Sequence, residues 1–412
     1  MTVIEFYDRT SIENIFGVLL LKPERMILVG SDAALLKKCT RSYKNVLRLR
    51  GIPTEVSYIC INKDYLKNTV NTLETIVKND DRCIFDLTGG EELHHVAVGV
   101  LMERYGEKVE CLRFNIINEA VIDCASKNCY SVHRPIDISV EEDILIYGGK
   151  MQKDKKLEHY TYPWSYTADF ILDVQKMWDL CKSNPKLWNA SIGTIGAIFE
   201  HIGLNNNLTL SFNEERARVL LLENKVNYSL TESFLQILSN KGLITSLSYD
   251  QKISFSFKNE QVMRCLTIAG QVLELIIAIR MMRLKDRHGA PLYNDVKVGV
   301  VMDWSLDDSD VMPETINEID IMAMRGTIPI FVSCKNGFFD ANELYKLNTV
   351  AEKFGDKYAK KVLIATGIKR MGIKGEYLIS RMKDMNIKCI HNPGAISEKD
   401  LDAILGSLWI NE

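Results

Sequence analysis

The chain has 412 residues, with 46% hydrophobic and 25% charged residues, and its formal net charge at pH 7 is −3. These values are ordinary for a globular protein of two or three domains, and the weak charge argues against firm non-specific binding of long nucleic acid by the whole surface. No run of 18 or more apolar residues is present, and the N-terminus lacks a basic segment followed by an apolar stretch, so we expect neither a membrane span nor a secretory signal. Ten scattered cysteines without a C-x-x-C pair indicate reduced thiols and a cytoplasmic location.

The first 115 residues alternate between short apolar runs and helical patterns. This alternation predicts an α/β domain over residues 1–150 with a doubly wound, Rossmann-like parallel sheet. In strand order 3-2-1-4-5, ligands bind at the carboxyl ends of the first and fourth strands, which flank the reversal point. We expect a strand pair over 137–149 to close this domain. The predicted strands are 3–7, 26–30, 56–61, 83–87 and 109–115, and the predicted helices are 12–21, 32–49, 63–79 and 91–105.

The loops after the first and fourth strands hold the candidate ligand-binding residues. Glycines let the backbone approach a ligand closely, and the helix that follows the second loop offers unpaired N–H groups to an anion. A tight strand-to-helix turn is the alternative interpretation. The absence of a G-x-G-x-x-G sequence argues against a dinucleotide, and an acid in the second loop could accept from a ribose hydroxyl or a base amine. The candidates are Asp8, Arg9, Thr10, Ser11, Thr88, Gly89, Gly90 and Glu91.

Residues 151–259 read as a linker followed by a helical, winged-helix-like region. A charged segment at 151–160 precedes helices around 168–182 and 191–201. The sequence at 230–257 then predicts a helix, a turn and a hairpin with Tyr249 and Asp250 at its tip. A reader of DNA grooves would carry a more basic helix, so we favour a packing or dimerisation role for this module.

Residues 260–412 predict a further α/β domain with a partly antiparallel sheet. A long helix is expected over 262–285 and another over 341–355. Strands are expected at 297–304, 317–324 and 328–335, as antiparallel neighbours, and at 360–366.

Charged residues lie at the ends of two of these strands. Because strand residues two apart point to one face, Glu318 and Asp320 share a face, as do Ser333 and Lys335. The two strands would bring acids and a lysine to one spot. Such a spot is either an ion-pair cluster, with Asp320 bound to Lys335, or a metal site of a hydrolase.

A hydrolase site would need hard oxygen ligands for Mg²⁺ or Mn²⁺ and a cation near the nucleophile. The candidate ligands are Asp320, Glu274 in an otherwise apolar helix, and the backbone carbonyl of Cys334, while Lys335 would hold the attacking water. The structural alternatives are pairing of Glu274 with an arginine and of Glu318 with Arg325.

Asp320 and the S-C-K sequence at 333–335, preceded by Glu274 on a helix, resemble the PD-(D/E)XK restriction-endonuclease core. Together with the T-G-G loop, they resemble the CRISPR ancillary nucleases, which join a CRISPR-associated Rossmann-fold (CARF) sensor to such a nuclease. The resemblance implies a homodimer that binds cyclic tetra-adenylate and cuts nucleic acid with Mg²⁺ or Mn²⁺. The usual acid two residues before the lysine is Ser333 here, so Glu274 or Glu318 must compensate.

We therefore predict a cytoplasmic, homodimeric, metal-dependent endonuclease of type III CRISPR defence, activated by a cyclic oligoadenylate and acting on single-stranded RNA or DNA. Its catalytic residues would be Lys335, Asp320, Glu274 and Glu318. Two alternatives are a ligand-sensing winged-helix transcription regulator and a ligand-independent DNA-processing nuclease.

Overall fold

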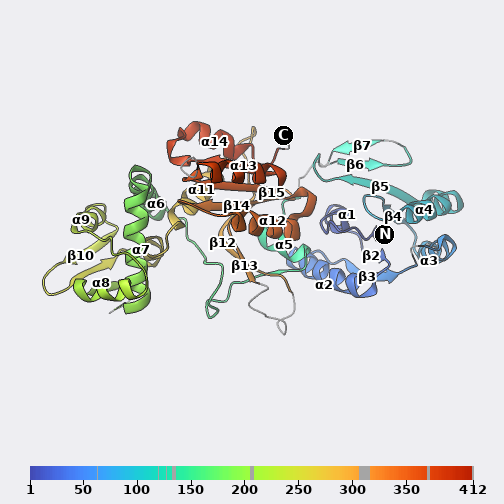
Figure 1. The fold of residues 1–412 in the computed structure, drawn as a ribbon. Coiled ribbons are helices and arrows are strands. Elements are labelled where there is room, and N and C mark those ends of the chain that lie inside the picture. The colour runs from blue at the N-terminus through green and yellow to red at the C-terminus, as the bar shows by residue number, and fades with distance from the viewer. Residues whose placement is uncertain are drawn as a thin grey trace.

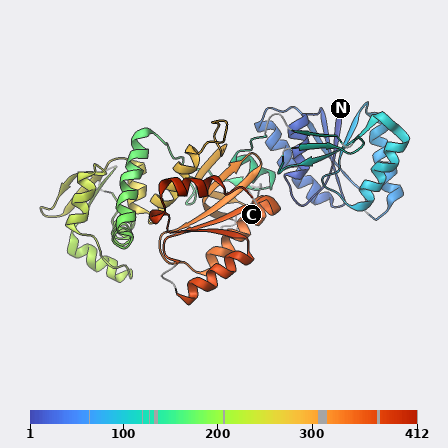
Figure 2. The same ribbon diagram turned by 90° about the horizontal axis from the view of Figure 1, so that it is seen from above.

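The computed structural model describes residues 1–62, 64–118, 120–126, 128–131, 136–204, 208–305, 316–368 and 372–410 (Figure 1). Within these residues, the strands form sheets of seven, three and six strands. The seven-stranded N-terminal sheet and the three-stranded sheet lie toward opposite ends of the molecule, with the six-stranded C-terminal sheet between them (Figure 2). Among the described helices, none is long and apolar enough to cross a membrane.

The N-terminal sheet has the strand order β3-β2-β1-β4-β5-β6-β7 and is parallel from β3 to β5. The predicted order of the first five strands is confirmed, and an antiparallel β5-β6-β7 extension lengthens one edge. Strands β1, β2 and β4 are almost wholly buried, as is usual for parallel strands covered by helices on both faces. The predicted start of the third helix at residue 63 lies outside the described residues. The elements are β1 (Thr2–Phe6), α1 (Glu13–Leu21), β2 (Arg25–Gly30), α2 (Ala33–Leu49), β3 (Glu55–Cys60), α3 (Leu66–Asn79), β4 (Cys83–Asp86), α4 (Glu92–Tyr105), β5 (Val109–Asn115), β6 (Ala120–Asp123) and β7 (Cys129–Ser131).

The segment after this sheet is a helix, so the predicted strand pair over 137–149 is wrong. Helix α5 (Val140–Ile146) begins with a capping box, in which the Ser139 hydroxyl accepts from the Glu142 N–H and the Glu142 carboxylate accepts from the Ser139 N–H at 2.7 Å. These two bonds satisfy N–H groups that a helix start leaves unpaired. The short strand β8 (Lys150–Met151) then pairs with β12 of the C-terminal sheet.

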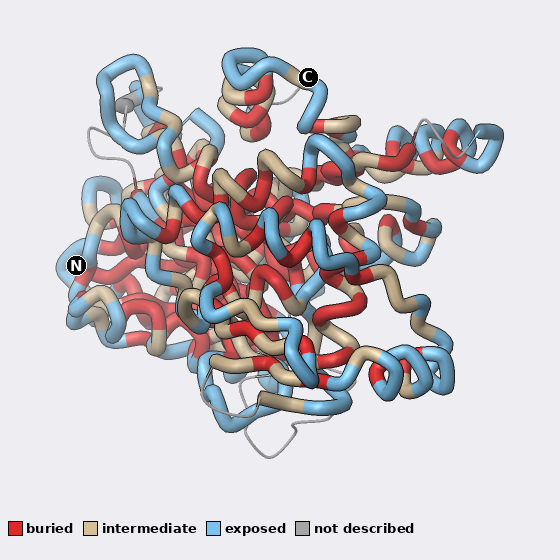
Figure 3. Tube along the Cα trace, turned by 90° about the vertical axis from the view of Figure 1, so that its left-hand side faces the viewer, coloured by how far each residue is buried: buried red, intermediate tan, exposed pale blue. Residues whose placement is uncertain are grey.

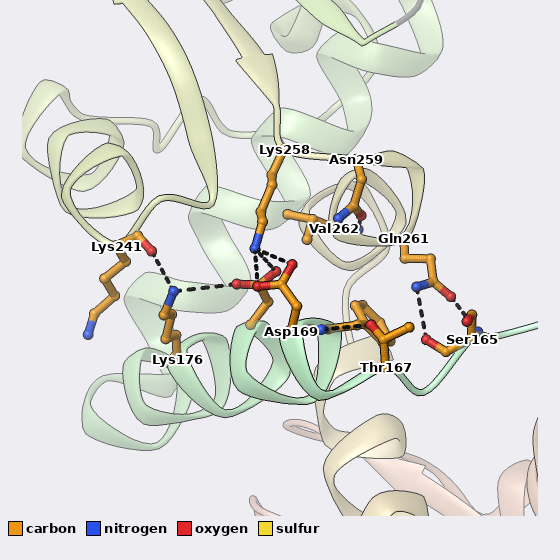
Figure 4. A network of polar contacts seen from close by, with 11 residues as sticks. Ser165, Thr167, Asp169, Lys176, Lys241, Lys258, Asn259, Gln261 and Val262 are labelled. Atoms are coloured by element: carbon orange, nitrogen blue, oxygen red, sulfur yellow. Dashed lines mark hydrogen bonds and ion pairs between the residues drawn. The ribbon is translucent and has the colours of Figure 1, made fainter.

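The middle of the chain has the predicted helix, turn and hairpin. Strands β10 and β11 form the hairpin after helix α9, and β9 completes a three-stranded sheet. Lys258, just after β11, ties this sheet to α6 through Asp169 and Asp173, at 2.9 and 2.6 Å (Figure 4). The elements are α6 (Ala168–Ser183), α7 (Pro185–Ile202), β9 (Thr209–Phe212), α8 (Glu214–Glu223), α9 (Glu232–Asn240), β10 (Ile244–Ser248) and β11 (Ile253–Phe257).

The C-terminal sheet has the strand order β16-β15-β14-β13-β12-β8. Its strands β12, β13 and β14 are antiparallel neighbours, as predicted, whereas β14, β15 and β16 are parallel. The α/β class predicted for this region is therefore confirmed. The elements are α10 (Glu260–Thr267), α11 (Gln271–Arg283), β12 (Asp295–Asp303), β13 (Ile316–Arg325), β14 (Ile328–Lys335), α12 (Ala341–Gly355), β15 (Lys360–Ala365), α13 (Ile373–Asp384), β16 (Ile387–His391) and α14 (Glu398–Gly406).

The single helix predicted over 262–285 is wrong, because the chain breaks between α10 and α11. Gly270 sits at the break with a φ of +97°, a left-handed conformation that side chains other than glycine rarely adopt. The break starts a new helix at Gln271 and so places Glu274 in the first turn of α11.

The N-terminal and C-terminal sheets share one continuous hydrophobic core. The cluster that contains Phe16 of α1 and Tyr43 of α2 runs through Ile144 of α5 to Phe331 of β14 and Phe354 of α12. In Figure 3 the buried segments gather toward the middle of the view and the exposed segments surround them. This packing holds the carboxyl end of β1 close to the end of α12.

Candidate functional site

Strands β13 and β14 bring Asp320 against the residues that end β14. The Cys334 N–H and the Ser333 hydroxyl both donate to Oδ2 of Asp320, at 2.6 and 3.2 Å. The ammonium of Lys335 lies 3.7 Å from the same oxygen. Ser333, which stands where an acid was expected, therefore supports Asp320 through its hydroxyl.

Helix α11 adds Glu274 to this cluster. Burial raises the pKa of its carboxyl well above the usual range, and the nearby Asp320 and Glu318 raise it further. The Gln271 side-chain amide donates to Glu274 at 2.8 Å, and no arginine pairs with Glu274 in the part of the chain that the structure describes. The structural alternative, a buried pair of Glu274 with an arginine, is therefore not found among the described residues.

Glu318 also faces the cluster. Burial, followed by repulsion from Asp320, raises the pKa of the Glu318 carboxyl. The alternative pairing with Arg325 is not seen, because the Arg325 guanidinium lies over the ring of Trp409 at 3.8 Å and donates to the carbonyl of Leu292.

The sequence analysis missed one acid that touches Lys335. Glu343, in the first turn of α12, lies 2.8 Å from the Lys335 ammonium and is about as exposed as the lysine itself. Burial acts to lower the pKa of Lys335, but Asp320 and Glu343 outweigh it, so the pKa is raised and the lysine stays charged. The position of Glu343 was detectable as an acid at the start of the helix that follows β14.

The donor set suits a hard divalent cation better than a soft one. All polar contacts of Asp320 fall on Oδ2, so Oδ1 has no protein partner among the described residues. No group of three or more His, Cys, Asp or Glu side chains that could hold a metal is found in the described ranges. Mg²⁺ needs fewer protein side chains than that, because it is usually bound by one or two carboxylates together with water and substrate phosphate. A cation here would also offset the repulsion from Asp320 and Glu318 that adds to the effect of burial on the pKa of Glu274.

The first ligand loop is fixed by its own side chains. The backbone N–H of Asp8 donates to the Asn14 side chain at 2.6 Å, the Asn14 amide donates back to the Asp8 carbonyl, and the Thr10 N–H donates to the Asp8 carboxylate. Arg9 is exposed, whereas Thr10 is buried. Arg9 is therefore the cation that this loop offers to solvent.

The second ligand loop lies directly against the first, as the strand order predicts. A Cβ atom on Gly89 would lie 2.8 Å from both the Phe6 carbonyl oxygen and the Asp8 Cβ. Gly89 is thus required by the contact between the two loops, and Gly90 by its φ of +99°. The Thr88 hydroxyl accepts from the N–H of Phe114 at 2.8 Å.

Two histidines that the sequence analysis did not single out hold this loop to α4. Nδ1 of His94 accepts from the Glu91 N–H at 3.1 Å, as half of a capping box, and a ring nitrogen of His95 lies 2.9 Å from the Gly89 carbonyl oxygen. Glu91 itself caps the helix.

A buried carboxyl pair lies beneath both loops and was also missed. Glu5 and Asp86 are opposite each other in the paired strands β1 and β4, and each is 1% exposed. Burial raises the pKa of Asp86 to about 6, and burial together with Asp86 raises the pKa of Glu5 well above its usual range. Two such neighbouring buried carboxyls resist ionising together. The sequence signal that could have revealed this pair was one acid within each of two otherwise apolar strands.

The first ligand loop also contacts the C-terminal region. The Thr10 hydroxyl donates to Asp356 at 3.0 Å, and Glu13 accepts from Lys357 and Tyr358 at 2.8 and 2.6 Å. Asp356 directly follows α12, whose other end carries Glu343. A cavity of about 340 Å³ lies at this junction, lined by residues of both regions, among them Tyr7, Arg9, Ser11, Trp304 and Lys353.

The geometry defines a two-part protein, in which a Rossmann-like sheet with a ligand-loop crevice is joined to a sheet carrying an acid and lysine cluster. No family model matches the chain, and no curated protein matches it by sequence. Solved structures match nearly its whole length, protein VC1899 and Can2 among them. Protein VC1899 from Vibrio cholerae gives a TM-score of 0.73 at 16% identity, over 99% of this chain and 97% of that one. Can2 from Sulfobacillus thermosulfidooxidans, in complex with cyclic tetra-adenylate, gives a TM-score of 0.68 at 14% identity, over 100% of this chain and 99% of that one.

These likenesses establish the fold. The chain shares its overall fold with Can2, a protein solved with cyclic tetra-adenylate bound, and the predicted resemblance is confirmed at the level of the fold.

Proposed function

We propose that the chain is a metal-dependent endonuclease of type III CRISPR defence, switched on by a cyclic oligoadenylate. The observation that carries this proposal is the convergence of Asp320, Glu274 and Lys335 at the end of one sheet, on a chain that shares its fold with a protein solved with cyclic tetra-adenylate bound. An ion-pair cluster alone would not gather acids whose pKa values are raised by burial and, after it, by one another's charge.

Asp320, Glu274 and the Cys334 carbonyl would hold Mg²⁺ or Mn²⁺. When bound, the cation polarises the scissile phosphoryl group and lowers the pKa of a bound water. The Ser333 hydroxyl and the Cys334 N–H both donate to Oδ2 of Asp320, and these hydrogen bonds fix the position of its other oxygen, Oδ1. Lys335 remains protonated, so its part is to orient the attacking water and to offset developing negative charge, not to remove a proton. Glu343 forms an ion pair with Lys335 and supplies a carboxylate in place of the one that is missing at Ser333.

The activator would bind over the two ligand loops. Arg9 supplies a positive charge, and the N-terminus of α4, which Glu91 and His94 cap, supplies the positive end of its dipole. A two-fold symmetric ring such as cyclic tetra-adenylate suits a symmetric pair of chains, because each copy presents the same loops to it. We therefore include a homodimer in the proposal.

The signal from the loops would reach the nuclease site along α12. Thr10 and Glu13 form hydrogen bonds with residues that follow this helix, and Glu343 at its start forms an ion pair with Lys335. The helix spans about 22 Å at 1.5 Å per residue and is anchored by buried apolar side chains, so a shift at one end is passed to the other. A ligand acts through such a link only by binding one arrangement more tightly than the other.

The decisive experiment is incubation of the protein with labelled single-stranded and double-stranded RNA and DNA, in Mn²⁺, with and without cyclic oligoadenylates. We expect cleavage only when both metal and activator are present, and none in excess EDTA. Cleavage that is indifferent to every cyclic oligoadenylate would leave a ligand-independent nuclease. No cleavage under any condition, together with specific binding of duplex DNA, would favour the transcription regulator.

A further inference from the structure

The sheet edge that carries Lys335 exposes four large apolar side chains. They are Phe338, Tyr345, Ile373 and Tyr377, with exposures of 72%, 43%, 86% and 49%, and we call them the aromatic edge. Phe338 lies in the turn that follows Lys335, Tyr345 lies near the start of α12, and the other two lie near the start of α13. Strands β14 and β15 are parallel, so the helices that follow them begin at the same edge of the sheet as the lysine.

Tyr345 and Tyr377 lie near one shared cation, and the turn that carries Phe338 contacts the turn after β15. The Arg381 side chain donates to the Tyr377 hydroxyl at 3.1 Å, and its guanidinium lies 5.5 Å from the centre of that ring. Tyr377 and, after it, Tyr345 act on the charge of Arg381, so both rings lie near this one cation. A side chain on Gly367 would collide with the carbonyl of Gly337, so the turn after β14 touches the turn after β15.

This surface has no structural reason to be apolar. The buried faces of α12 and α13 already meet the core through Leu344, Leu347 and Leu378, and the aromatic edge lies on the other side. Contiguous exposed apolar surface on a folded chain commonly marks a binding site. The aromatic edge is continuous with the Lys335 cluster. It would therefore face the nucleic-acid chain that leads into that site.

We propose that the aromatic edge is a stacking platform for unpaired bases of a single-stranded nucleic acid, which it guides toward Lys335. Flat rings stack on any base, at a gain that does not depend on sequence, whereas a duplex keeps its base faces covered. The exposed Lys346 and Lys374, with Arg381, are on the same two helices as Tyr345 and Tyr377 and would meet the phosphates between stacked bases. Arg381 also has Asp384 at 4.0 Å, a weak contact that leaves its donors available. This inference rests on the proposed nuclease function and names its substrate class.

The test measures binding separately from cleavage. A fluorescein-labelled 12-nucleotide DNA strand is titrated with the full-length protein in EDTA, at fixed salt, and its anisotropy is followed. Tyr377→Ala and Phe338→Ala should each raise Kd by about 5- to 100-fold, and Tyr377→Phe should bind like wild type because the ring is kept. Tyr65→Ala removes a ring of similar exposure, 54%, from the N-terminal region and serves as the matched control. A strand of the same length with abasic sites should bind wild type as weakly as the alanine variants bind the normal strand.

Equal binding by wild type and both alanine variants would overturn the platform, and so would equal binding of the normal and abasic strands. Absence of measurable single-strand binding by wild type would overturn it as well. Failure of the nuclease proposal gives a different pattern, in which binding depends on the rings but no activator and metal produce cleavage. Circular dichroism of each variant checks that its fold is kept.

Discussion

Replacement of Glu274 by glutamine separates a catalytic acid from a structural one. Glutamine keeps the shape of the side chain and its contact with Gln271, but it removes the charge that the cluster repels. The folded state raises the pKa of Glu274, so it holds the proton to higher pH than the unfolded chain does. The stability that this gives is complete below the ordinary glutamate pKa of about 4.3 and is lost as the pH rises through the raised value.

The expected magnitude follows from this linkage. While the folded acid is still protonated and the unfolded one is not, wild-type stability falls by up to about 1.4 kcal/mol per pH unit. The variant Glu274→Gln lacks this pH-dependent loss of stability, so in EDTA its melting temperature should rise relative to that of wild type as the pH increases above the ordinary glutamate pKa. For a unit the size of the C-terminal region the difference should grow by about 2–4 °C per kcal/mol. The same variant should lose activator-dependent cleavage.

The assay is differential scanning fluorimetry at several pH values, with and without Mn²⁺, beside a cleavage assay. Wild type should gain melting temperature on addition of Mn²⁺, and the variant should gain little. Glu376→Gln, at an exposed position of α13, is the control and should behave like wild type. A variant that melts lower than wild type, increasingly so toward alkaline pH, while it still cuts nucleic acid would refute the reasoning and make Glu274 a structural partner.

Three further predictions address the other parts of the proposal. Asp320→Ala and Lys335→Ala should each abolish cleavage while the proteins stay folded and keep activator binding, and full activity in either variant would remove that residue from the site. Arg9→Ala should weaken binding of cyclic tetra-adenylate in calorimetry by about 10- to 150-fold, as expected for loss of a charge-assisted contact, and unchanged affinity would move the site elsewhere. Thr10→Val should leave activator affinity nearly intact but reduce the fold-activation of cleavage by about 2- to 10-fold, because it removes the hydrogen bond to Asp356. Activation equal to that of wild type would exclude this contact from the signalling route.

The order of the N-terminal strands could be predicted because strand and helix periodicities are local properties of the sequence. The same holds for the pairing of β13 with β14, in which a period of two placed Asp320 and Lys335 on one spot. The capping box that starts at Ser139 was equally local, yet the prediction for residues 137–149 was a strand pair. There the hydrogen bonds of a helix start prevailed over residue preference.

The sequence by itself determined the two sheets, the crevice loops and the acid–lysine pair, and it revealed that Ser333 stands where an acid was expected. It could not supply the acid that touches the lysine, because Glu343 reaches Lys335 only when α12 folds back along β14. The buried carboxyl pair of Glu5 and Asp86 exists only once β1 and β4 are neighbours. The bond from Thr10 to Asp356 joins residues 346 positions apart, and it depends on how the two sheets pack through their common core. Contacts of that kind are decided by tertiary packing, since no local pattern fixes which distant surfaces meet.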